Sequence, residues 1–200
     1  MKRYTADELN NSLQRQHDFD MLDLRPVSEF LDQSIPGSIS LPMDEEQFVG
    51  NLRKIWPHPK NLVLVTSDEN VLDKVLDAVR EVGGRVIGYV ILNDWLSRGY
   101  PTNRIESVEV DELLADSQRY SLVDVRLNEE WRKQHIPHSI NVPLATIDNS
   151  SPMLDRNGEH VAFCAGIYRG IAGAAKLSAQ GYKVKYLPGG VSAWYQKTNQ

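Results

Sequence analysis

The chain has 200 residues, of which 41% are hydrophobic and 24% are charged, and its formal net charge is -5 at pH 7. This length suits one large domain or two of about 100 residues each, both long enough to bury a core. No apolar run approaches the roughly 20 residues that a membrane span needs, and the acidic balance argues against nucleic acid as a partner.

A segment of the first half returns in the second half. Residues 23–42 align without a gap with residues 124–143, and the two segments share nine identical residues. Between the halves, residues 101–104 form a short polar connector. A repeat of this size predicts two domains of similar structure, residues 1–104 and residues 105–200.

Strand and helix patterns alternate in each half, which favours a parallel sheet covered by helices on both faces. In the second half, the expected strands are residues 121–125, 139–142, 160–163 and 184–187. Helical patterns follow the first, third and fourth of these strands. The sequence therefore predicts an α/β fold in both domains.

The only cysteine, Cys164, lies between an expected buried strand and an expected helix. The loop between them is a helix N-terminus, where unpaired backbone N–H groups and the helix dipole favour an anion on the cysteine sulfur. Arg169 adds a positive charge. We expect these groups together to lower the pKa of Cys164 below its ordinary value of about 8.5. The residues expected to line the cradle are Ala165, Gly166, Ile167, Tyr168 and Gly170.

One cysteine also bears on the compartment of the protein. It excludes an intramolecular disulfide and is typical of a reducing environment. The residues after Met1-Lys2-Arg3 are polar, unlike the apolar centre of a signal peptide. We therefore expect a cytoplasmic protein.

The first half has no cysteine at the equivalent position. Counting back from a shared glycine places Thr66 at the position of the cysteine and Val71 at the position of Arg169. Asp68 and Glu69 then put negative charge where an anion would bind. Since no base to activate the hydroxyl is evident, this half is predicted to be non-catalytic and to serve packing, partner docking or the shaping of a substrate entrance.

Three motifs in this order resemble the rhodanese (sulfurtransferase) family. They are the Asp-x-Arg, Glu, Ile-Pro-x-Ser segment, the Cys-x-x-x-x-Arg loop, and Leu-Pro-Gly-Gly before Trp194. The resemblance covers nearly the whole chain as a tandem pair of rhodanese-like domains. The loop from Cys164 to Arg169 is most similar to that of rhodanese domains associated with persulfide dioxygenases.

The resemblance implies a function as well as a fold. It implies a sulfurtransferase that moves sulfane sulfur from thiosulfate or a low-molecular-weight persulfide to a thiol or to cyanide, through a Cys164 persulfide. It implies no metal and no organic cofactor. The implied partners are small-molecule sulfur donors and thiol acceptors, together with a persulfide dioxygenase or another sulfur-relay protein.

Within this scheme Cys164 and Arg169 are the predicted catalytic residues. The supporting residues are Asp124, Arg126 and Glu130, which are equally well interpreted as a purely structural set of ion pairs. Two loop positions depart from the family pattern, with Ile167 in place of Gly and Gly170 in place of Ser or Thr. Ile167 is expected to narrow the pocket or to resist a positive φ, which Gly166 would then adopt.

Two other functions use similar features. A phosphatase or arsenate reductase of the same fold also holds an anion near a cysteine, but in those enzymes five residues separate the cysteine from the arginine. Here four residues separate Cys164 from Arg169, and one residue of extended chain adds up to about 3.5 Å. The other alternative is a non-catalytic binding or regulatory module. The presence of both Cys164 and Arg169 argues against it.

Overall fold

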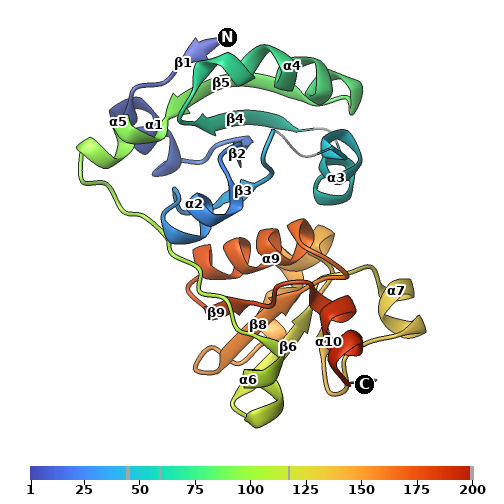
Figure 1. The fold of residues 1–200 in the computed structure, drawn as a ribbon. Helices are drawn as coiled ribbons and strands as arrows, with labels where there is room; N and C mark the ends of the chain where they lie inside the picture. The colour runs from blue at the N-terminus through green and yellow to red at the C-terminus, as the bar shows by residue number, and fades with distance from the viewer. Residues whose placement is uncertain (44–45, 59, 117, 199–200) are drawn as a thin grey trace. The chain divides into compact units, whose positions relative to one another are not determined.

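The chain folds into two compact units, Met1–Arg104 and Ile105–Gln200. The computed structural model describes residues 1–43, 46–58, 60–116 and 118–198. Each unit contains one sheet in which all the strand pairs are parallel, and each is described below by itself (Figure 1).

The first unit has a five-stranded sheet in the order β1-β5-β4-β2-β3. The strands are β1 (Lys2–Arg3), β2 (Phe19–Asp23), β3 (Ser38–Ser40), β4 (Asn61–Thr66) and β5 (Arg85–Ile91). The helices are α1 (Ala6–Leu13), α2 (Val27–Asp32), α3 (Phe48–Ile55), α4 (Leu72–Glu81) and α5 (Leu92–Ser97). Buried residues of α1 and α5 share one apolar cluster with β2, β4 and β5, and α3 packs with α4.

The second unit has a four-stranded sheet in the order β7-β6-β8-β9. The strands are β6 (Tyr120–Asp124), β7 (Ile140–Asn141), β8 (Glu159–Phe163) and β9 (Lys183–Tyr186). The helices are α6 (Val110–Ala115), α7 (Asn128–Lys133), α8 (Ile147–Ser150), α9 (Tyr168–Ala179) and α10 (Gly190–Thr198). Because α9 covers one face of the sheet while α6 and α10 cover the other, the predicted α/β class with helices on both faces is confirmed (Figure 1).

Alternation along β8 decides which way the cysteine faces. Val161 and Phe163 belong to the apolar cluster formed with α6 and α10. Successive side chains of a strand point to opposite faces, so Ala162 and Cys164 point toward α9. Tyr186 pairs with Ala162 in the parallel register and therefore lies on the same face. The fold thus brings the sulfur and the start of α9 together.

Helix α9 packs unusually close to the sheet because it has glycines at the contact. A Cβ atom on Gly173 would lie 2.6 Å from Cγ1 of Val125, closer than real Cβ contacts. One turn earlier, a Cβ on Gly170 would lie 3.2 Å from the backbone nitrogen of Cys164. Glycine lowers helix propensity by about 1 kcal/mol relative to alanine. This close approach is the packing reason for tolerating that cost.

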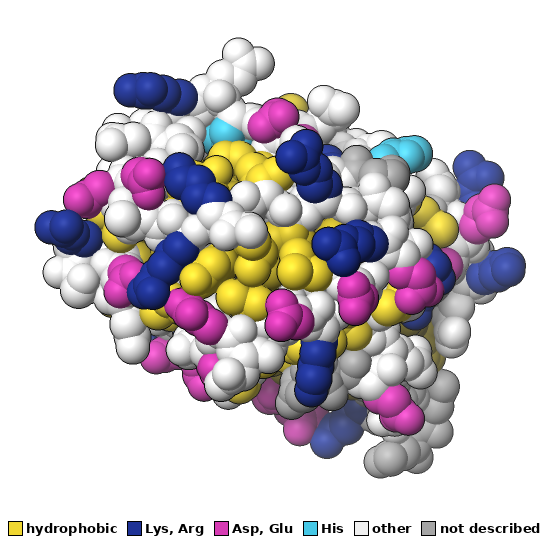
Figure 2. Space-filling view, turned by 90° about the horizontal axis from the view of Figure 1, so that it is seen from above, with side chains coloured by type: hydrophobic (Ala, Val, Ile, Leu, Met, Phe, Trp, Pro, Cys, Tyr) yellow, Lys and Arg dark blue, Asp and Glu magenta, His cyan; other side chains and the backbone are white. Residues whose placement is uncertain are grey.

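The described surface mixes charges of both signs. On the face seen in Figure 2, lysine and arginine alternate with aspartate and glutamate around an area of apolar side chains. Among the helices of the described residues, none combines the length and the apolar character needed to cross a bilayer.

Candidate active site

Cys164 follows directly after the last residue of β8, and only 3% of it is exposed. Its sulfur accepts a hydrogen bond from the backbone N–H of Gly166, with N and Sγ 3.3 Å apart. The backbone N–H of Gly170 also favours the ionised sulfur and lowers the pKa of Cys164. Helix α9 starts at Tyr168 and runs for twelve residues. The sulfur therefore lies at a helix N-terminus, where main-chain donors favour negative charge.

The expected lowering of the Cys164 pKa is wrong for the resting site. Burial raises the pKa of the Cys164 thiol, because the charged form loses its hydration. The N–H groups of Gly166 and Gly170 and the charge of Arg169 lower it, but burial has the larger effect. Sequence patterns identify the donors around a sulfur but not the depth at which the fold buries it.

None of the residues in the loop between the cysteine and α9 has a positive φ. Ile167 has φ of -114°, and Gly166 is not among the glycines with positive φ, so the expected left-handed residue in this loop is wrong. Ile167 is 46% exposed at the tip of the loop. The side-chain hydroxyl of Ser192 donates a hydrogen bond to the carbonyl oxygen of Ala165 at 2.8 Å, which ties the loop to α10.

Gly170 packs between the ring of Tyr186 and the backbone of Cys164. A Cβ on Gly170 would be 3.0 Å from Cε2 of Tyr186, so the serine or threonine of other family members would be crowded here. Burial and the negative charge of the nearby Cys164 thiolate both raise the pKa of the Tyr186 phenol. Tyr186 was not predicted from the sequence. Its one signal is its position immediately before the Leu-Pro-Gly-Gly motif.

The positive charge of Arg169 is compensated, because its guanidinium group forms an ion pair with the carboxylate of Glu130. Its two terminal nitrogens donate to the two carboxylate oxygens, with Nη1–Oε2 at 2.6 Å and Nη2–Oε1 at 2.8 Å. The hydrogen bond to Glu130 raises the pKa of Arg169, and the same bond lowers the pKa of Glu130. Both side chains are thus charged at neutral pH.

The other two supporting residues form a separate, local pair. Arg126 Nη2 donates to Asp124 Oδ2 at 2.7 Å, and a second bond from the same nitrogen reaches the carbonyl of Gln134 at 2.7 Å. Arg25 makes the same contact with Asp23 at 2.7 Å in the first unit. Since the unit without a cysteine keeps this pair, we assign it a structural role. Of the three predicted supporting residues, Glu130 therefore binds Arg169, whereas Asp124 and Arg126 pair with each other.

The equivalent position in the first unit is occupied by Thr66, as predicted. Asp23 pairs with Val65 in β4, as Asp124 pairs with Phe163 in β8, so the next residue in each unit is Thr66 and the cysteine respectively. The Thr66 hydroxyl donates to the carbonyl of Asp68 at 2.8 Å. This hydrogen bond occupies the hydroxyl in a local turn.

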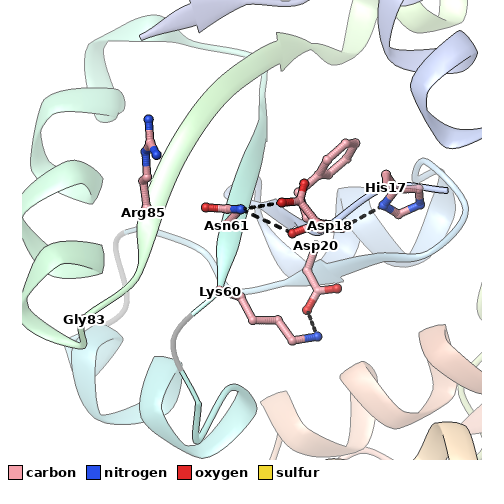
Figure 3. A pocket seen from close by; sticks show the side chains of 8 residues that line it. His17, Asp18, Asp20, Lys60, Asn61, Gly83 and Arg85 are labelled. Atoms are coloured by element: carbon pink, nitrogen blue, oxygen red, sulfur yellow. Dashed lines mark hydrogen bonds and ion pairs between the residues drawn. The ribbon is translucent and has the colours of Figure 1, made fainter. Parts of the chain in front are cut away.

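A polar hollow of about 460 Å³ lies elsewhere in the first unit (Figure 3). It is at the starts of β2, β4 and β5, the opposite end of these strands from Thr66. Lys60 pairs with Asp20 at 2.9 Å, and Asn61 donates to Asp18 at 3.0 Å. Among the described residues, no group of three or more His, Cys, Asp or Glu is placed to hold a metal ion.

Comparison with known proteins identifies the family of the second unit. The model of the rhodanese-like domain matches residues 107–197. The sulfurtransferase of Allochromatium vinosum is 31% identical over 93 residues, which cover 46% of this chain and 87% of that protein. The chain belongs to the rhodanese family. Relatives of this kind support a sulfurtransferase type of activity for this rhodanese.

Two further similarities extend beyond one domain. The HTH-type transcriptional regulator Rv0324 of Mycobacterium tuberculosis is 32% identical over 135 residues, 66% of this rhodanese. The aligned part spans 52% of the regulator's length. The crystal structure of thiosulfate sulfurtransferase from Pseudomonas aeruginosa has a TM-score of 0.43 and 16% identity, and the match covers 100% of this chain and 43% of that one.

Proposed function

We propose that this rhodanese is a sulfurtransferase in which Cys164 carries sulfane sulfur as a persulfide. The observation behind the proposal is the position of the sulfur, next to the loop that precedes α9, with Sγ 3.3 Å from the backbone nitrogen of Gly166. A persulfide anion needs a small site with main-chain donors, which a helix N-terminus supplies. Four residues separate Cys164 from Arg169, which makes this loop one residue shorter than the loop that the phosphatase alternative requires.

The proposed first step transfers one sulfur atom to the cysteine. Sγ of Cys164 attacks the sulfane sulfur of the donor, a new S–S bond forms, and the bond from that sulfur to the rest of the donor breaks. Thiosulfate would leave as sulfite, and a thiol persulfide would leave as the thiol. Because burial favours the protonated cysteine, its proton passes to the leaving sulfite or thiolate, which balances the charge.

The second step regenerates the cysteine. A thiolate or cyanide attacks the outer sulfur of the persulfide and leaves as a new persulfide or as thiocyanate, and Cys164 recovers its electron pair as a thiolate, which takes up a proton from solvent to restore the thiol. The N–H groups of Gly166 and Gly170 would stabilise negative charge in both steps. Apart from this solvent proton, the proposed cycle uses only the chain and its two small substrates, with no metal or organic cofactor taking part.

We further propose a low-molecular-weight persulfide, such as glutathione persulfide, as the preferred donor. Tyr168 begins α9 beside the loop and is half-buried, which places an aromatic ring where a thiol carrier would approach. The partner that this donor suggests is a persulfide dioxygenase or another protein of a sulfur relay. The unit Met1–Arg104 is proposed as non-catalytic, serving to dock a partner or shape the entrance.

Steady-state kinetics test the proposal. Purified protein is given glutathione persulfide or thiosulfate as donor and cyanide as acceptor, and thiocyanate is measured. We expect parallel double-reciprocal plots, since the donor leaves before the acceptor binds. Absence of turnover with both donors would overturn the proposal and favour the non-catalytic module. Hydrolysis of an aryl phosphate at a comparable rate would favour the phosphatase alternative.

A further inference from the structure

The ion pair between Glu130 and Arg169 gives the site a charge balance that the loop sequence does not suggest. Both terminal nitrogens of the guanidinium are used, at 2.6 and 2.8 Å from the carboxylate oxygens. The side chain of Arg169 is 16% exposed and that of Glu130 is 34% exposed, so solvent screens the pair only in part. The positive charge of Arg169, which acts on Cys164, is therefore compensated by the negative charge of Glu130.

Glu130 is held in place independently of the arginine. Its Oε2 accepts the backbone N–H of Leu127 at 3.1 Å, and the positive charge of Arg126 also favours its ionised form. A carboxylate fixed in this way is present before a substrate arrives. Any anion that binds Arg169 end-on must either displace this carboxylate or lie beside it.

The first unit provides an internal comparison. Glu29 stands at the position of Glu130, but it is 52% exposed, and its contact with Arg25 is 3.7 Å long. Val71 replaces the loop arginine there. Within the described residues, the bidentate pair thus occurs in the unit that contains the cysteine. The Asp-x-Arg pair, in contrast, occurs in both units, which is the behaviour expected of a feature that the fold itself requires.

We propose that Glu130 is a specificity-determining residue, which limits the use of thiosulfate and other donors with a sulfonate-type group by occupying and neutralising Arg169. This inference depends on the sulfurtransferase function proposed above. Thiosulfate brings two negative charges and a sulfonate group that matches the occupied edge of the guanidinium. A thiol persulfide presents a single reacting sulfur to the main-chain donors and has less need of Arg169.

The carboxylate should also act on the cysteine through the arginine. The charged and titratable groups near the sulfur are Arg169 from α9, Asp124 from β6 and Tyr186 from β9. Arg169 lowers the pKa of Cys164. Removing the charge of Glu130 leaves the positive charge of Arg169 less compensated, so the pKa of Cys164 should fall.

Glu130→Gln tests the inference, with Glu129→Gln as the matched control. Glutamine keeps the shape of the side chain and one hydrogen bond, and Glu129 is an exposed neighbour, so both variants change the net charge equally. We expect the kcat/KM for thiosulfate, relative to glutathione persulfide, to rise about fivefold or more in Glu130→Gln. The pH profile of iodoacetamide alkylation of Cys164 should shift to lower pH in the same variant.

The outcomes separate this inference from the proposed function. If wild type uses neither donor, the sulfurtransferase function itself fails. If wild type transfers sulfur but the donor ratio in Glu130→Gln matches that in Glu129→Gln, Glu130 does not determine specificity. Should Glu130→Gln unfold, Glu130→Asp provides the second variant: its shorter carboxylate loosens the pair, and an unchanged donor ratio there would equally overturn the inference.

Discussion

Cys164→Ser is expected to lower the rate of sulfur transfer about a thousandfold or more, to the background of the uncatalysed reaction. A serine hydroxyl is a far weaker nucleophile at neutral pH and forms no persulfide. The substitution is small and the side chain is buried beside main-chain donors, so the fold should persist. The measurement is thiocyanate formation with glutathione persulfide, together with circular dichroism to verify folding.

Thr66→Ala is the matched control, because Thr66 holds the equivalent position in the first unit. It should leave the rate close to that of wild type, at a modest cost in stability from the lost hydrogen bond to the carbonyl of Asp68. Transfer at the wild-type rate by folded Cys164→Ser would remove the basis of the mechanism. Loss of activity in folded Thr66→Ala would show that the first unit takes part in catalysis.

Gly190→Ala is expected to destabilise the second unit by about 3 kcal/mol or more. A Cβ on Gly190 would lie 1.9 Å from the carbonyl oxygen of Cys164, and the residue has φ of +50°, where a side chain is strained. The backbone has little freedom to move away, because the N–H of Val191 donates to that same oxygen at 2.9 Å. Hydrogen exchange of the amides of β8 measures the effect on this unit.

Gly181→Ala provides the comparison for this prediction. Gly181 also has positive φ, +85°, but nothing lies within 4 Å of the added Cβ. It should therefore cost only the backbone strain, about 1 kcal/mol. Equal protection of β8 in the two variants would mean that the close approach of Gly190 to the cysteine backbone is unimportant.

The layout of the fold could be predicted because it follows local patterns. Alternating strand and helix signals indicated parallel sheets, and counting back from a shared glycine gave Thr66 the position in its unit that Cys164 has in the other, as the strand registers confirm. A helix after the cysteine was also predictable from residues 171–177, but the structure starts α9 three residues earlier, at Tyr168. The ends of the strands expected in the second half differ from the observed ends by at most one residue, a difference that local patterns do not fix.

The electrostatics of the site could not be predicted in the same way. Glu130 and Arg169 are 39 residues apart, and only the packed positions of α7 and α9 bring them together. The pKa of Cys164 depends on burial by several elements at once, so the donors alone gave the wrong direction. One signal in the sequence was available: the glutamate is repeated as Glu29, but the loop arginine is not.

The most direct test of the central claim is mass spectrometry of the intact protein after brief exposure to glutathione persulfide, followed by peptide mapping. We expect a gain of the mass of one sulfur atom, located on the peptide that contains Cys164, and its loss when cyanide is added. Cys164→Ser should gain nothing under the same conditions. Turnover without a sulfur adduct on Cys164, or an adduct that cyanide does not remove, would contradict the account.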